Sequence, residues 1–128
     1  SYAGVYFNSD PNIIGRYPLP ASIARLPKRS NRTSMGEAMR FISSCEVLLT
    51  NSYHGAYWAQ LLGRPVILVG AYSAKFHAYR DQPPVWDGKG NWEDLLPGAV
   101  PNPKALHDAR WANIEFHTNV CKLLETPR

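Results

Sequence analysis

Hydrophobic positions are densest in one stretch near the middle of the chain, residues 45–70. Two short runs in it, residues 46–50 and 65–69, carry aliphatic side chains at consecutive rather than alternate positions. Strands of this kind are buried on both faces, as in a parallel sheet covered by helices. About a dozen residues separate the two runs, which is the usual length of a helical crossover. The pattern therefore predicts a strand, a helix and a second, neighbouring strand.

Polar and small residues mark the two ends of that predicted helix. Asn51 and Ser52 can each accept a hydrogen bond from the first backbone N–H groups of the helix. Gly63 can adopt the left-handed conformation that ends a helix, and Pro65 prevents its continuation. In a parallel sheet, the turn before the helix lies at the carboxyl end of a strand, which is where open α/β sheets bind ligands.

The flanking segments complete an alternation of strands and helices. Residues 1–7 read as an opening strand, and the prolines of residues 8–27 allow only loops and short turns there. Ser34 and Glu37 have the spacing of a reciprocal helix cap, so a helix begins at this point. Residues 70–103 form a long connection rich in proline and glycine, and residues 104–124 have the spacing of a final amphipathic helix. We predict one three-layer α/β domain over residues 1–128 with a mainly parallel sheet.

Composition places the chain among ordinary globular domains. Of its 128 residues, 45% are hydrophobic and 19% are charged. No apolar run approaches the roughly 18 residues of a membrane span, and no segment reads as a signal peptide. Cys45 and Cys121 lack the spacing of metal ligands, and no metal site is expected. We interpret both as buried free thiols in a reducing, cytoplasmic setting.

Positive charge is concentrated in the first third of the chain. Residues 11–36 contain five basic side chains and no acidic one. The basic residues are Arg16, Arg25, Lys28, Arg29 and Arg32. Such a stretch could meet phosphate, carboxylate or nucleic acid. Because basic and aromatic residues do not interleave here as in nucleic-acid modules, a solvated basic face is the simpler interpretation, and no nucleic-acid partner is expected.

His54 is the strongest candidate for chemistry. The glycines form neither a dinucleotide fingerprint nor a phosphate loop, and the chain has no GxSxG motif. His54 falls in the first turn of the predicted central helix, where the helix dipole favours an anion. Gly55 allows a ligand or another backbone to approach closely. Two interpretations stay open: a binding site, or a histidine bonded to a loop carbonyl beside a glycine that lets the helix pack on the sheet.

Residues 41–69, FISSCEVLLTNSYHGAYWAQLLGRPVILV, followed by Ser73, Lys75 and Phe76, resemble the carboxyl-terminal signature of the polysaccharide pyruvyl transferase family. That signature is a strand ending in Ser or Thr, a His-Gly pair that opens a helix, and a helix ending in Leu-Gly-x-Pro-Val. The matching residues are Thr50, Ser52, His54, Gly55, Leu62, Gly63, Pro65 and Val66. The resemblance implies a Rossmann-like domain, similar to one lobe of the two-lobe GT-B glycosyltransferases.

The resemblance also implies a reaction. Members of this family transfer a pyruvyl group from phosphoenolpyruvate to a sugar hydroxyl of an exported or cell-surface polysaccharide. No cofactor is expected for this chain. His54 would be the catalytic histidine, and Lys75 and Arg80 would hold the carboxylate and phosphate of the donor. With the strand-end position of the turn, this predicts a site formed by Asn51, Ser52, His54, Gly55, Lys75 and Arg80.

One departure keeps other functions open. The family enzymes have two lobes with the active cleft between them, whereas this chain provides one lobe. A GT-B glycosyltransferase lobe and a non-catalytic ligand-binding or protein-binding module are therefore alternatives. We also expect self-association or a partner in place of the missing amino-terminal lobe. The reason is an aromatic surface predicted to face the cleft, formed by Tyr57, Trp58, Trp86 and Trp92.

Overall fold

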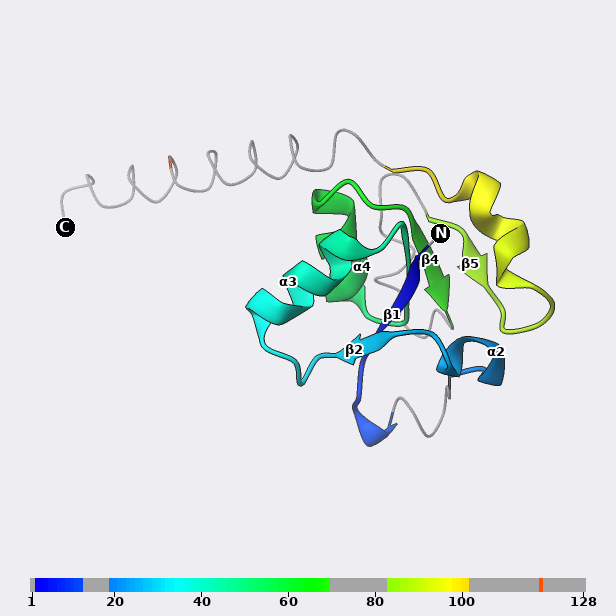
Figure 1. The fold of residues 1–128 in the computed structure, drawn as a ribbon, viewed down its shortest axis with the longest axis horizontal. Coiled ribbons are helices and arrows are strands. Elements are labelled where there is room, and N and C mark those ends of the chain that lie inside the picture. The colour runs from blue at the N-terminus through cyan, green and yellow to red at the C-terminus, as the bar shows by residue number, and fades with distance from the viewer. Residues whose placement is uncertain (1, 13–18, 70–82, 102–117, 119–128) are drawn as a thin grey trace, which may run out of the picture.

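The computed structural model describes residues 2–12, 19–69, 83–101 and 118 (Figure 1). The described residues form a five-stranded sheet with the order β2-β1-β3-β4-β5. All four strand pairings are parallel. The strands are β1 (Ala3–Phe7), β2 (Lys28–Ser30), β3 (Val47–Thr50), β4 (Val66–Val69) and β5 (Val85–Trp86).

Helices cover both faces of this sheet. They are α2 (Ala21–Ala24), α3 (Met35–Ser44), α4 (Tyr53–Leu61) and the 3-10 helix η2 (Trp92–Gly98). In Figure 1, α3 and α4 lie side by side on one face, whereas η2, in yellow, lies on the other side of the sheet. The predicted Rossmann-like α/β domain with three layers is therefore confirmed.

The two central strands explain why their sequences are apolar throughout. β3 and β4 are buried at every position and pair in parallel, with Leu49 opposite Ile67. Leu48 and Leu68 pack beneath α3 and α4, while Leu49 and Ile67 belong to the cluster on the opposite face. Since both faces are covered, no position of either strand tolerates a polar side chain unless it is hydrogen-bonded. The predicted pair of neighbouring parallel strands is confirmed.

The strand order creates a natural place for a ligand. From β1 the chain passes through α2 to β2 at the edge of the sheet, and then returns through α3 to β3 on the other side of β1. The connections after β1 and β3 thus leave towards opposite edges. A crevice forms outside the carboxyl ends of these two strands, and such switch points are where doubly wound sheets bind their ligands.

Three elements were missed by the sequence prediction. β2 contains only Lys28, Arg29 and Ser30, so it has no apolar run that would signal a strand. It is a strand because its backbone pairs with β1, where Asn31 N donates to Phe7 O at 3.3 Å. β5 and η2 lie inside the predicted long connection and were not anticipated either. The predicted final helix, residues 104–124, lies outside the described residues except at position 118.

The predicted helix ends are largely confirmed. Ser34 Oγ accepts from Glu37 N at 3.4 Å, while the Glu37 carboxylate lies 3.6 Å from Arg29 Nε. Gly63 ends α4 with φ of 70°. Its N–H donates to Gln60 O at 3.0 Å, and the next N–H donates to Ala59 O at 2.8 Å. These are the two bonds of a Schellman motif, which requires the left-handed residue that glycine provides.

Cys45 is a buried free thiol, as predicted, and Cys121 lies outside the described residues. The Cys45 Sγ donates to Phe41 O at 3.3 Å between α3 and β3. Burial raises the pKa of the Cys45 thiol to about 11, although a hydrogen bond with Ser44 and the charge of Arg64 act in the opposite direction. The thiol is therefore protonated at neutral pH and is a poor nucleophile.

We expect this thiol to make stability depend on pH in the alkaline range. Because the pKa of Cys45 is higher in the folded chain, its contribution is full below about pH 8.5 and is lost as pH rises through about 11. The loss is on the order of 1 to 3 kcal/mol. Urea unfolding across this range, compared with Cys45→Ala, measures it. Equal slopes of unfolding free energy against pH for the two proteins would contradict the prediction.

The predicted uncovered aromatic surface is wrong for two of its members. Trp86 is 3% exposed, and its Nε1 donates to Lys89 O at 2.9 Å. Trp92 packs against the core cluster beneath η2. Trp58 is partly buried against the opposite cluster, and Tyr57 alone of the four is strongly exposed, at 41%. These side chains lie on different faces of the sheet, so self-association stays a prediction without this support.

Within the described residues, no helix combines the length and apolarity that crossing a membrane requires.

Candidate functional site

A pocket of about 240 Å³ lies at the carboxyl ends of β1, β2 and β3, and we call it the edge pocket. Its polar lining consists of Asn8, Asn31, Thr33, Ser52 and His54. Its apolar wall includes Tyr6, Met35, Ala38 and Trp58. The volume is somewhat below the roughly 300 to 1,000 Å³ typical of drug-sized ligands. The edge pocket therefore suits a small ligand, or one unit of a larger one.

Thr50 fixes the chain as it leaves β3. Its fully buried Oγ1 donates to Tyr6 O at 2.6 Å and accepts from Ser52 N at 3.0 Å. Ser52 Oγ in turn accepts from Gly55 N at 3.2 Å and so caps α4, as predicted. These bonds place His54 in the first turn of α4, directly after the strand end.

Replacing Thr50 with valine is expected to destabilise the domain by about 1 to 3 kcal/mol. Valine has nearly the same shape but leaves the Tyr6 carbonyl and the Ser52 N–H without their buried partner. Thr50→Ser keeps the hydroxyl and is the matched control, with a smaller loss from the missing methyl group. Chemical denaturation of the three proteins measures the difference. A valine variant as stable as the serine variant would show that the hydroxyl is not needed.

Asparagine side chains tie the three strand ends together. Asn51 Oδ1 accepts from Asn8 N at 2.7 Å, and Asn8 Oδ1 accepts from Asn31 Nδ2 at 3.4 Å. Asn31 Oδ1 also accepts from the Ser9 hydroxyl at 2.7 Å. The prediction that Asn51 caps α4 is therefore wrong, because its oxygen accepts from the loop after β1 and Ser52 is the cap. Its Nδ2 is buried and has no partner among the described residues.

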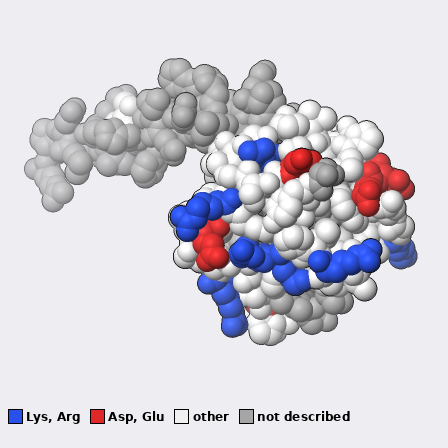
Figure 2. All heavy atoms as spheres, viewed as in Figure 1, with Lys and Arg blue, Asp and Glu red and all other residues white. Residues whose placement is uncertain are grey.

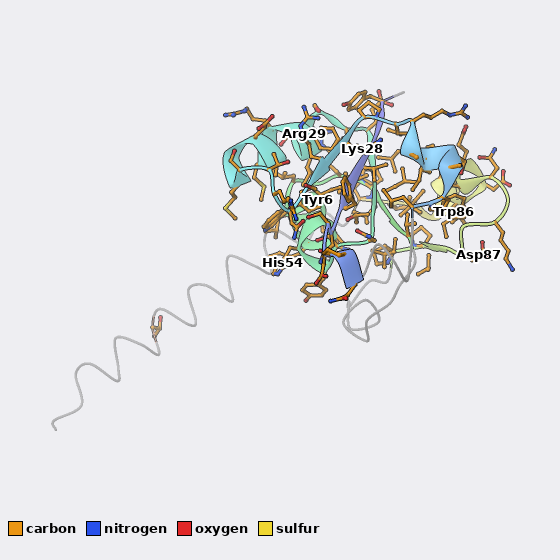
Figure 3. All side chains as sticks on the ribbon, turned by 90° about the horizontal axis from the view of Figure 1, so that it is seen from below. Tyr6, Lys28, Arg29, His54, Trp86 and Asp87 are labelled. Atoms are coloured by element: carbon orange, nitrogen blue, oxygen red, sulfur yellow. The ribbon has the colours of Figure 1, made fainter. Side chains whose placement is uncertain are left out.

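His54 stands exposed at the rim of the edge pocket. Its ring centroid lies 5.9 Å from that of Trp58, with 31° between the planes. Trp58 in turn meets Tyr6 edge to face at 5.9 Å. Figure 3 shows His54 near Tyr6 at one end of the sheet, away from Trp86 and Asp87. The imidazole is thus held against an aromatic wall yet open to a ligand.

Gly55 has a packing role. A Cβ atom at this position would lie 2.5 Å from Tyr6 Cδ1 and 2.9 Å from Thr50 Oγ1. Both neighbours are buried, at 2% and 0% exposure. Gly55 therefore lets α4 approach the sheet closely, as one of the two sequence interpretations proposed. Its predicted contact with substrate stays a prediction.

The structure brings only part of the predicted site into one place. Ser52 and His54 line the edge pocket, whereas Lys75 and Arg80 lie outside the described residues. Sequence reasoning missed Asn8, Asn31 and Thr33, and it named Trp58 only as part of an aromatic surface facing a cleft. Asn8 directly follows the first predicted strand, so the rule that selected Asn51 could have found it. Asn31 and Thr33 could not be found, because β2 was not predicted.

A larger cavity of about 540 Å³ lies at the other end of the strands from the edge pocket. Its lining includes Tyr2, Val47, Pro65 and Leu96, which lie at the amino ends of the strands and on η2. Parallel α/β sheets bind ligands at the carboxyl ends of their strands, so we place the candidate site in the edge pocket. Among the described residues, no cluster of His, Cys, Asp and Glu could hold a metal ion.

The chain was compared with protein families, curated proteins and solved structures. No protein-family model matches this chain, and no curated protein or solved structure matches it significantly. The fold and the edge pocket therefore define its class, a Rossmann-like α/β domain with a candidate ligand site at the switch point of a parallel sheet. Any particular activity is a proposal.

Proposed function

We propose that this chain is a pyruvyl transferase lobe that moves a pyruvyl group from phosphoenolpyruvate to a polysaccharide sugar. The observation that carries the proposal is the position of His54, exposed on the first turn of α4 and lining the edge pocket at the switch point. The His-Gly and Leu-Gly-x-Pro residues that carry the family resemblance lie at the two ends of α4. Geometry and resemblance thus select the same histidine.

The proposed reaction requires one side chain that donates a proton to phosphoenolpyruvate. Protonation of the methylene carbon of phosphoenolpyruvate makes the adjacent carbon electrophilic. A sugar hydroxyl adds to that carbon, and its proton returns to the imidazole. The C–O bond to phosphate then breaks, and a second hydroxyl of the same sugar adds in its place to close the ketal, its proton leaving with the phosphate. We assign His54 as the general acid for the first step, because it lines the edge pocket and a protonated imidazole can donate a proton to a bound ligand.

The lining of the edge pocket favours the sugar rather than the phosphate. Besides the Tyr6 hydroxyl and the Trp58 indole N–H, its described polar groups are two amides, two aliphatic hydroxyls and one imidazole, with no Lys or Arg among them. Amides and hydroxyls pair with sugar hydroxyls, and the Trp58 ring can pack on the C–H face of a sugar. We therefore assign the sugar to the edge pocket, and the anionic donor to Lys75 and Arg80, as the family resemblance implies.

Titration of phosphoenolpyruvate by isothermal calorimetry tests this assignment. We expect the wild-type chain to bind it, and Lys75→Ala or Arg80→Ala to weaken binding by about 1.5 to 3 kcal/mol, the usual cost of a lost charged hydrogen bond. Thr33 lines the edge pocket, so Thr33→Ala serves as the control, and we expect its affinity for phosphoenolpyruvate to be unchanged. Absent binding by wild type, or equal affinities in all variants, would remove the donor site.

The uncharged lining also favours a second candidate, a saccharide-binding module without turnover. In that case an oligosaccharide binds in the edge pocket while phosphoenolpyruvate does not bind. A UDP-sugar included in the same calorimetric series distinguishes the glycosyltransferase alternative, since a nucleotide-sugar site would favour that ligand over phosphoenolpyruvate.

A further inference from the structure

Basic side chains form a band along one edge of the sheet. Figure 2 shows Lys and Arg side chains crossing the face on which β2 and α2 lie in Figure 1. On these elements, Arg25 ends α2, Lys28 and Arg29 lie in β2, and Arg32 lies in the turn that follows; we call these four residues the basic stripe. Arg25, Lys28 and Arg32 are exposed, and the Arg29 side chain is 42% exposed.

The charge of the basic stripe is mostly uncompensated. Among the described residues its one ion pair joins Arg29 and Glu37, at 3.6 Å. The Lys28 ammonium donates to the backbone carbonyl of Ala24, which is not charged. Arg25 and Arg32 have no acidic partner in the described part of the chain. Three of the four cations are therefore available to an anionic ligand.

The basic stripe runs directly into the edge pocket. β2 ends at Ser30, and the next residues form a tight turn in which Thr33 N donates to Ser30 O at 2.9 Å. Asn31 and Thr33 line the edge pocket, and exposed Arg32 lies between them in the turn. A chain molecule with one unit in the edge pocket would thus pass Arg32 first and then the cations of β2.

We propose that the acceptor is an acidic saccharide chain, with its terminal sugar in the edge pocket and its carboxylates on the basic stripe. This inference rests on the proposed function, because it names the acceptor of the same site. An acidic saccharide matches the two surfaces, because the edge pocket has no Lys or Arg in its described lining whereas the adjoining basic stripe is cationic. Two acids are close in sequence to the edge pocket. Glu37, next to Ala38, pairs with Arg29 at 3.6 Å, and Asp10, in the loop after β1, is exposed and accepts from Asn12 N at 2.9 Å.

A saccharide fits the basic stripe better than a nucleic acid does. Single-stranded nucleic acids need aromatic rings on which successive bases stack, interleaved with cations. Among the described residues, the aromatic rings of Phe41 and Phe7 lie beside β2. Phe41 is 7% exposed, and the Arg29 guanidinium lies 5.0 Å from its ring centroid, while Phe7, opposite Ser30, packs against the core cluster on the other face. Both rings thus pack against the core, and the basic stripe itself offers charge without a stacking surface.

Binding of defined oligomers tests the inference without requiring turnover. The ligands are an oligogalacturonate, a neutral oligosaccharide of the same length and a single-stranded oligonucleotide of equal charge. Each is titrated into wild type, the double variant Lys28→Gln with Arg32→Gln, and the control Lys89→Gln. Lys89 is exposed on the loop after β5, at the other edge of the sheet.

We expect the oligogalacturonate to bind most tightly to wild type and about fivefold more weakly to the double variant, with Lys89→Gln unchanged. High salt should reduce this difference, because exposed charges are screened. Equal binding of the neutral oligosaccharide, an unchanged double variant, or tighter binding of the oligonucleotide would overturn the inference. Oligogalacturonate binding by a chain that does not bind phosphoenolpyruvate would refute the proposed function while keeping the saccharide site.

Discussion

Gly55→Ala is expected to lower the free energy of unfolding by about 1 to 3 kcal/mol, the usual cost of adding a methyl group to a packed core. The new Cβ would lie 2.5 Å from the Tyr6 ring and 2.9 Å from Thr50 Oγ1, so α4 or the ring must move. Tyr6 also forms part of the edge pocket wall and packs on Trp58. The variant should therefore change the environment of Trp58, which its fluorescence reports.

Gly36→Ala is the matched control for this prediction. Gly36 lies in the first turn of α3, and a Cβ there would meet no atom within 4 Å. Alanine restricts the unfolded chain and should stabilise the domain by about 0.4 to 1 kcal/mol. Urea denaturation of both variants should therefore give changes of opposite sign. A Gly55→Ala protein that is as stable as wild type would mean that α4 does not pack on β1 and β3 as described.

His54→Ala is expected to reduce phosphate release from phosphoenolpyruvate and an acceptor saccharide by about 100- to 10,000-fold, the usual contribution of a general acid. The affinity for phosphoenolpyruvate should change little, because the charges assigned to the donor are those of Lys75 and Arg80. Removal of the exposed imidazole should also leave the fold intact, since none of the hydrogen bonds that hold the β3 turn uses its side chain. A coupled phosphate assay with saturating donor measures the turnover.

Tyr57→Ala is the control for His54. Tyr57 is exposed on the same helix and does not line the edge pocket, so its replacement should leave phosphate release unchanged. Equal turnover by wild type and His54→Ala would remove His54 from the chemistry. Loss of turnover together with loss of donor binding would instead assign His54 a role in holding the donor.

Local sequence determined the centre of this fold. Continuous apolar residues in β3 and β4 favour burial on both faces, which a parallel sheet covered by helices provides. The side-chain cap of Ser52 and the left-handed Gly63 act within a few residues of themselves, so they set the ends of α4 in any surroundings. The position of His54 on the first turn of α4 followed from these local features.

Tertiary structure decided which residues meet at the edge pocket. Lys28–Ser30 becomes a strand only through its pairing with β1, and that pairing brings Asn31 and Thr33 beside Ser52. Asn51 is of a residue type that commonly caps helices, yet its side-chain oxygen accepts from Asn8 N, 43 residues away in the chain. Both outcomes depend on backbone groups that every residue type except proline carries. Side-chain patterns along the sequence cannot reveal such contacts, because the free energy of a hydrogen bond depends on which groups the fold brings together.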